Sequence, residues 1–373
     1  MSSSSKPAKE KQRFNYIDQF RGLVGVLMLL GHSSYYFNGI WNHLDPFDPL
    51  FPSRAQFILR YIGYLCAPGF LMMSGAMVWW SFQQHTKKDM SPMKARWHLI
   101  QRGLFLVLVQ VTWVNSSWGG FKEFQPGHLG IIACIGLSMV LLTVFINTQW
   151  YIRLLVAIAM LIIHPFLLQI TYDPKVVWQE VVMQTFVDAG DFNKYPVLPW
   201  FALMSLGSVM ATAWIKIWKT DKQRILYGAL IAAGAILLAI GVRMGRGFGN
   251  ILPFSDFGTY TFFIDQKYPP SLFHNLWFFG WVVAGVTLFI GVGKLAPRLL
   301  SFLSIPGKVP LFFYAMHLAI LGVFIKRFDL FYREGGVWES LLGLVIMTAI
   351  MLPLCKWFYR VKLTSKNYFI RLI

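Results

Sequence analysis

Residues 16–43 read YIDQFRGLVGVLMLLGHSSYYFNGIWNH, and this stretch decides the fold class. Its centre is unbroken apolar, whereas Asp18 and Arg21 stand near its start and His32 stands near its end. A helix over 17–37 would be about 31 Å long, which is enough to cross the hydrocarbon core of a bilayer. Ionisable groups at membrane depth are costly and usually functional. The stretch therefore predicts a first membrane-spanning helix that carries polar groups toward both faces.

The composition also indicates a membrane protein. Of the 373 residues, 56% are apolar and only 13% are charged, against roughly 25% charged in soluble domains. The formal net charge of +18 would suggest nucleic acid in a soluble protein. Its distribution follows membrane topology instead, so we expect no nucleic-acid partner. Cys66, Cys134 and Cys355 lie in apolar runs without metal-ligand spacing, so we expect buried small residues and no metal site.

Apolar runs long enough to span a bilayer recur along the chain and predict an all-α polytopic membrane protein of about ten transmembrane helices. The predicted spans are 17–37, 58–82, 98–118, 127–147, 151–170, 197–218, 225–243, 271–292, 309–327 and 338–358. Residues 248–264 are apolar but interrupted by Gly, Pro and Asp. We interpret them as a re-entrant or interfacial loop because irregular backbone does not face lipid.

Basic residues are unevenly shared between the two sides that this helix count defines. The side of the N-terminus collects most of the lysines and arginines, and the opposite side takes most of the acids. The positive-inside rule then places both termini in the cytoplasm. We expect residues 1–13 to form a disordered basic tail without a cleavable signal, residues 14–362 to form one transmembrane domain, and residues 363–373 to form a second basic tail. Such a surface also attracts anionic membrane lipid.

Two histidines near the expected outer face are the candidate catalytic residues. His32 lies in the outer third of the first helix, and a neutral imidazole can act as a general base near neutral pH. His43 follows in the sequence WNHLDPFDP, where Asp45 and Asp48 could orient its ring. Each histidine has a plainer interpretation: His32 as a structural residue bonded to a neighbouring helix, and His43 as a solvated loop residue.

Five further residues are candidates for substrate or cofactor binding. Asp18 and Arg21 are one helical turn apart, which fits either a structural ion pair or an arginine facing a nucleotide phosphate. Arg60 lies at the outer end of the second helix and could contact an anion. Tyr268 lies in the outer-face sequence DQKYPPSLFHN, and His317 lies at mid-membrane depth in the ninth helix.

Five sequence blocks, in order, resemble one family. They are FNYIDQFRGLVGVLMLLGH (14–32), RYIGYLCAPGFLMMSGA (60–76), YPVLPWFALMSLG (195–207), KYPPSLFHNLWFFG (267–280) and IPGKVPLFFYAMHLAI (305–320). Together they resemble the bacterial relatives of heparan-α-glucosaminide N-acetyltransferase, the DUF1624 family. The resemblance covers most of the chain.

This resemblance implies an integral membrane acyltransferase, in the bacterial inner membrane. Such enzymes take an acyl group, typically acetyl, from cytosolic acyl-CoA and pass it to a hydroxyl or amine of a carbohydrate or glycolipid acceptor on the outer face. Acetyl-CoA would then be a co-substrate. The resemblance also implies a catalytic histidine late in the first helix, which is His32 here, with His43 the nearest match to the lysosomal enzyme. The acid that usually precedes the bacterial histidine is Gly31 in this chain.

Other functions fit part of the same pattern. A proton-coupled transporter or flippase of a glycan or lipid would use His32, His317 and Asp18 as a proton relay. A structural membrane subunit would use them for packing alone. The sequence leaves the acceptor, the length of the acyl group and the oligomeric state, monomer or homodimer, open. A cavity that connects both faces beside His32 and is lined by arginines at the inner face would favour the enzyme.

Overall fold

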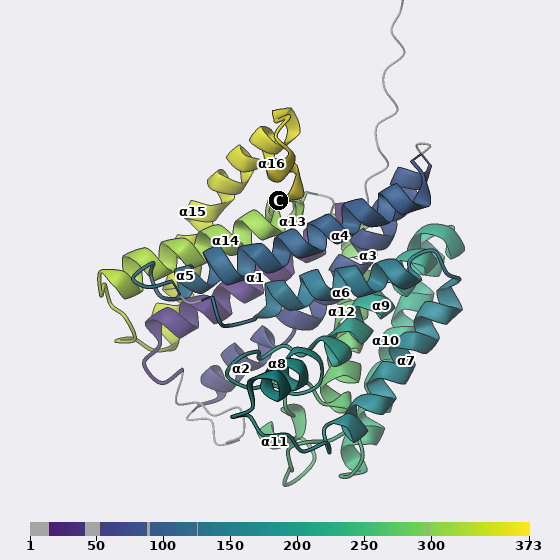
Figure 1. The fold of residues 1–373 in the computed structure, drawn as a ribbon, viewed down its shortest axis with the longest axis horizontal. Helices are drawn as coiled ribbons and strands as arrows, with labels where there is room; N and C mark the ends of the chain where they lie inside the picture. The colour runs from purple at the N-terminus through teal and green to yellow at the C-terminus, as the bar shows by residue number, and fades with distance from the viewer. Residues whose placement is uncertain (1–14, 42–52, 88–89, 125, 297) are drawn as a thin grey trace, which may run out of the picture.

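A computed structural model gives the fold, and it describes residues 15–41, 53–87, 90–124, 126–296 and 298–373 (Figure 1). These residues form an all-helical protein, as the apolar runs predict, and no strand is assigned within them. His43, one of the two predicted catalytic residues, lies outside the described residues. The predicted tails and domain limits stay predictions.

The longer helices mostly lie within or across the predicted spans. They are α1 (Asn15–Phe37), α3 (Cys66–Thr86), α4 (Pro92–Val109), α6 (Ile131–Phe145), α7 (Trp150–Leu167), α9 (Val197–Thr212), α10 (Asp221–Met244), α12 (Leu272–Leu295), α14 (Pro310–Ile320) and α15 (Val337–Thr364).

Short helices extend or connect them. The α-helical ones are α2 (Arg54–Gly63), α5 (Asn115–Trp118), α8 (Val177–Phe186), α11 (Tyr260–Phe263), α13 (Ser304–Lys308) and α16 (Tyr368–Leu372). Three π-helical turns, η1 (Gln110–Val114), η2 (Ala213–Ile217) and η4 (Leu321–Arg327), continue α4, α9 and α14, and η3 (Ser301–Leu303) is a 3₁₀ turn.

Among the described residues, eight helical segments are long and apolar enough to cross a membrane, which makes this a multi-pass membrane protein. The two remaining predicted spans are both helical. The helix α6 is shorter than the predicted 127–147, and α1 is longer than a span needs but carries several polar side chains. The count of ten spans and the cytoplasmic location of the termini therefore stay predictions.

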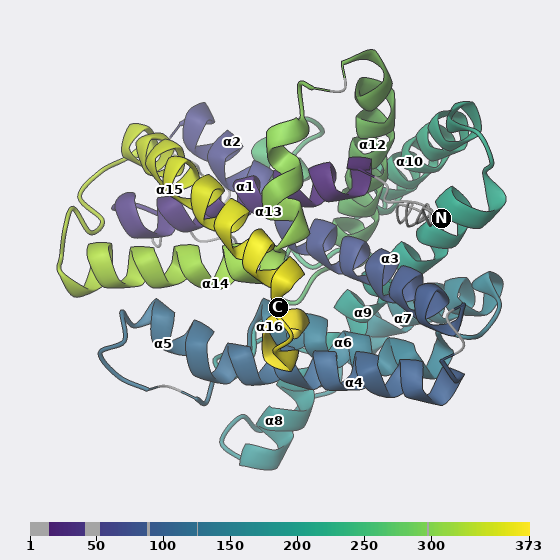
Figure 2. The same cartoon turned by 90° about the horizontal axis from the view of Figure 1, so that it is seen from above.

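Among the described candidate spans, the most apolar segment is also the least buried within the bundle. The most apolar window of α10 has a mean hydropathy of 2.4, and 17% of it is buried in the bundle. The corresponding window of Val197–Ile217 has a mean hydropathy of 1.4, and 83% of it is buried. Figure 1 places α7 and α10 at the periphery of the bundle. The helix α1 runs through the middle, in contact with α3, α12, α13, α14 and α15 (Figure 2). A central helix has less lipid to face, so it can carry polar groups.

The helices α3 and α9 cross closely because each presents a glycine to the backbone of the other. A Cβ on Gly75 would overlap the carbonyl of Met204, and a Cβ on Gly207 would overlap the carbonyl of Met72. Small residues at such crossings allow the close packing that holds membrane helices together. The three cysteines are free and buried, as the sequence predicts.

We expect Gly75→Leu to destabilise the fold strongly. The added side chain has to displace the α9 backbone rather than a flexible side chain, and overpacking costs about 1–3 kcal/mol or occasionally more. Thermal unfolding of the purified protein in detergent measures the effect. Gly234→Leu is the matched control, because Gly234 is exposed on α10 and a Cβ there meets no neighbouring atom. Equal unfolding temperatures for the two variants would contradict the packing argument.

A buried ion pair organises the segment between α10 and α12. The guanidinium of Arg243 donates to the carbonyl oxygens of Leu252, Thr261, Phe262 and Ile264 at 2.6–3.1 Å. The carboxylate of Asp265 lies 3.4 Å from the same guanidinium. Irregular backbone is thus satisfied by side chains. The segment delivers the residues that follow Asp265 to the interior of the bundle.

Candidate active site

A cavity of about 580 Å³ opens beside the second half of α1. Its walls come from α1, α2, α3, η1, α5 and α14 and from the segments that precede α9 and α12. Segments distant in sequence therefore meet at one space. His32, Arg60, Lys267, Tyr268 and Tyr314 are among its lining residues.

His32 is hydrogen-bonded to His317 from α14. The distance from His32 Nδ1 to His317 Nε2 is 2.7 Å, and His317 Nδ1 lies 2.6 Å from the carbonyl oxygen of Phe313. A carbonyl only accepts, so His317 Nδ1 carries the proton and His317 Nε2 carries a lone pair. That lone pair accepts from the Nδ1–H of His32. The second nitrogen of His32, Nε2, is then left with a lone pair on a side chain that lines the cavity.

Aromatic rings fix the plane of the His32 imidazole. The ring of Trp118 meets it edge-on at 5.1 Å between centroids, and the ring of Tyr314 does so at 5.8 Å. Trp118 is itself stacked on Tyr36 at 5.9 Å. Edge-to-face contacts of this kind favour a single orientation, so the free Nε2 of His32 is held in place.

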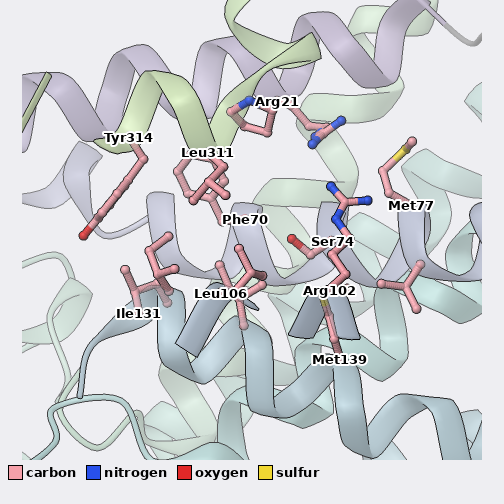
Figure 3. A pocket seen from close by; sticks show the side chains of 14 residues that line it. Arg21, Phe70, Ser74, Met77, Arg102, Leu106, Ile131, Met139, Leu311 and Tyr314 are labelled. Carbon is pink, nitrogen blue, oxygen red and sulfur yellow. The ribbon is translucent and has the colours of Figure 1, made fainter. Parts of the chain in front are cut away.

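A second, narrower pocket of about 80 Å³ lies nearer the start of α1 (Figure 3). Apart from Arg21, Arg102 and Ser74, its lining is largely apolar. Figure 3 shows the two guanidinium groups pointing toward one another. Convergent like charges favour an anion between them. Arg21 also forms an ion pair with Asp18 at 3.7 Å.

The two spaces meet at a shared wall. Phe70, Ile131 and Tyr314 line both of them. The two spaces follow α1, with Arg21 in the lining of the narrower pocket and His32 in the lining of the larger cavity. The three shared residues separate the arginine side from the imidazole side.

Cationic and aromatic side chains contribute much of the lining of the larger cavity. Among the described residues, its lining includes Arg60, Lys194, Lys267 and Lys326 and no carboxylate. The Arg60 guanidinium lies 4.6 Å from the centroid of the Trp41 ring, and its buried Nε has no hydrogen-bond partner. This cavity therefore brings positive charge next to aromatic rings.

Lys267 acts on a pair of tyrosines in the same region. Its ammonium lies 5.1 Å from the ring centroids of Tyr64 and Tyr268, and the hydroxyls of Tyr195 and Tyr268 are 2.9 Å apart. Burial opposes ionisation of Tyr268, but Lys267 and the hydrogen bond with Tyr195 hold its pKa below the ordinary value. Burial and the neighbouring Tyr268 raise the pKa of Tyr195.

The sequence of residues 13–244, more than half of the chain, matches the family model for the catalytic region of heparan-alpha-glucosaminide N-acetyltransferase. The chain belongs to this family. No curated protein matches it at a significant level. The family match includes His32, Arg60 and Arg102 and ends before Tyr268, Tyr314 and His317. In this member of the N-acetyltransferase family, the larger cavity is therefore completed by the part of the chain that follows the matched region.

Most of the residues that the sequence singled out are brought together. His32, Arg60 and Tyr268 line the larger cavity, and His317 contacts it through His32. Arg21 lines the narrower pocket, and Asp18 lies beside Arg21, outside both linings. These placements do not test the roles assigned to them, which stay proposals.

The sequence analysis did not single out Arg102, Trp118, Lys267 and Tyr314. Tyr314 could have been found from its position one turn before His317, because i and i+3 share a helix face. Lys267 directly precedes Tyr268. Arg102 and Trp118 give no comparable signal. Among the described residues, no group of three or more His, Cys, Asp and Glu side chains could hold a metal ion.

Proposed function

We propose that this protein is an acetyltransferase that moves an acetyl group from cytosolic acetyl-CoA to a saccharide amine or hydroxyl at the outer face. The single observation that carries the proposal is the meeting of two spaces beside His32. One of them ends at a pair of arginines, and the other is wide and lined by cations and aromatic rings. Two substrates from opposite sides would meet at one imidazole, which is catalysis by proximity.

The narrower pocket suits coenzyme A. Arg21 and Arg102 would bind its phosphates, because guanidinium groups recognise phosphate well. Along α1, the eleven residues from Arg21 to His32 rise about 16 Å, which is comparable with an extended pantetheine arm. The apolar lining between them would hold that arm. The thioester would then reach the wall formed by Phe70, Ile131 and Tyr314.

His32 would be the general base. Its Nε2 takes the proton from the acceptor amine or hydroxyl as that group attacks the thioester carbon. The C–S bond breaks, and the coenzyme A thiolate takes the proton from His32. His317 positions His32 throughout, since its Nε2 accepts the Nδ1–H. The roles match those of a catalytic triad, with an imidazole in place of the usual carboxylate.

Transfer of labelled acetyl by the purified protein tests the proposal. Protein in liposomes would receive radiolabelled acetyl-CoA and a glucosaminide acceptor, and acetylated product and free coenzyme A would be measured. We expect equal amounts of the two. Movement of the glycan across the bilayer without consumption of acetyl-CoA would indicate a transporter and contradict the proposed acetyltransferase activity.

The cationic lining of the larger cavity predicts a preference for acceptor sugars that carry negative charge. Lys267 is buried and lines the cavity, and the described part of that lining contains no carboxylate. We expect Lys267→Gln to raise KM for glucosamine 6-sulfate about tenfold, equivalent to about 1.4 kcal/mol, with little change for uncharged glucosamine. Steady-state kinetics with both acceptors measure the difference.

Lys175→Gln is the control for this prediction. Lys175 is exposed, precedes α8 and lines neither space, yet its replacement removes the same charge. An equal rise in KM for both sugars in Lys267→Gln would show that the lysine shapes the cavity and does not recognise charge.

A further inference from the structure

Tyr314 occupies the boundary between the two spaces. Of the three residues that line both, it alone carries a hydroxyl, and its side chain is buried. In Figure 3 its ring stands at one end of the narrower pocket, and its hydroxyl points away from Arg21 and Arg102. A group at this boundary therefore lies next to the Tyr314 side chain.

The Tyr314 hydroxyl carries a proton that it can donate to an oxygen atom at this boundary, because a phenol O–H is a hydrogen-bond donor. Trp118 lines the larger cavity together with Tyr314, and both rings meet the His32 imidazole edge-on. The hydroxyl and the base therefore belong to one packed aromatic cluster.

The base and the hydroxyl are neighbours. The ring centroids of Tyr314 and His32 are 5.8 Å apart, and Tyr314 stands one helical turn before His317. A carbonyl held at the boundary would lie between them, within reach of a proton donor and next to the base. An active site for acyl transfer needs this juxtaposition of a base and an oxyanion donor.

We propose that the Tyr314 hydroxyl is a catalytic residue that stabilises the oxyanion of acetyl transfer. This inference rests on the proposed function. When the acceptor attacks, the carbonyl electron pair moves to oxygen, and the proton of the attacking group goes to His32 Nε2. Tyr314 O–H donates to the negative oxygen. The carbonyl then re-forms, the C–S bond breaks, and the thiolate takes the proton from His32. Tyr314 keeps its own proton throughout.

Tyr314→Phe tests the inference, because it removes the hydroxyl and keeps the ring. We expect kcat to fall about 100-fold, the size of effect seen when one oxyanion donor is lost, with KM for acetyl-CoA unchanged. Tyr36→Phe is the matched control. Tyr36 is also fully buried, packs on the same Trp118 and has a hydroxyl without a hydrogen-bond partner. It lines neither space, so its kcat should equal that of the native protein.

The outcomes separate this inference from the function on which it rests. An active native protein whose Tyr314→Phe variant keeps full kcat overturns the role of the hydroxyl and leaves the acetyltransferase standing. A rise in KM for acetyl-CoA with kcat unchanged would assign Tyr314 to binding alone and also overturn it. Absence of acetyl transfer by the native protein would overturn the proposed function itself.

Discussion

Replacement of His32 by alanine is expected to lower kcat for acetyl transfer by about 10²–10⁴-fold, the usual contribution of a general base. The variant loses the nitrogen that would take the acceptor proton, but it keeps the arginines and the apolar pocket that would bind coenzyme A. KM for acetyl-CoA should therefore change little. Single-turnover transfer from labelled acetyl-CoA, with the dissociation constant measured in parallel, separates chemistry from binding.

The control for His32→Ala is His98→Ala. His98 lies on α4, contacts His85 at 5.1 Å between ring centroids, and lines neither of the two spaces. His98→Ala should leave kcat within about twofold of the native value, because substitutions away from such sites usually have small effects. Full activity in His32→Ala would contradict the role of His32 as the base. His43 would then be the remaining candidate base, and His43→Ala should be inactive.

The sequence predicted α1 well because two different signals coincide there. The apolar centre predicts a helix over 17–37, and the helix observed is Asn15–Phe37. Its functional role was predicted from the polar residues Asp18, Arg21 and His32, which interrupt the apolar pattern. The same residues make α1 too polar to count as a span by hydropathy. Burial within the bundle explains this, since Phe20, Val24, Leu29 and Tyr36 are fully buried against other helices.

The pairing of His32 with His317 could not be predicted from the sequence. The two residues are 285 positions apart, and each has an equally good explanation as a lone buried histidine. Which helices touch depends on packing details such as the glycine crossing of α3 and α9. The same is true of Arg102, which resembles any basic residue near a membrane interface until the fold places it with Arg21 in the lining of the narrower pocket. Helix positions were therefore predictable, whereas helix neighbours were not.

The chemistry of the site depends on that pairing more than on either histidine alone. Acids commonly orient a catalytic imidazole, and the position before His32 is occupied by Gly31, which has no side chain to offer. His317 supplies the acceptor instead. Its own tautomer is set by the Phe313 carbonyl, one turn earlier on the same helix. The backbone of α14 therefore determines which nitrogen of His32 is free.

His317→Leu is expected to lower kcat about 100-fold or more, because loss of the correct tautomer in a comparable triad costs even more. Leucine fills similar space but cannot accept the His32 Nδ1–H. His317→Gln should recover part of the loss, since its amide oxygen can accept that proton. Heteronuclear NMR of labelled histidine nitrogens should show the Nδ1–H form of His32 in the native protein and in the Gln variant, and a mixture in the Leu variant. A native-like tautomer in the Leu variant, or equal rates for the Leu and Gln variants, would assign His317 to packing and remove it from the mechanism.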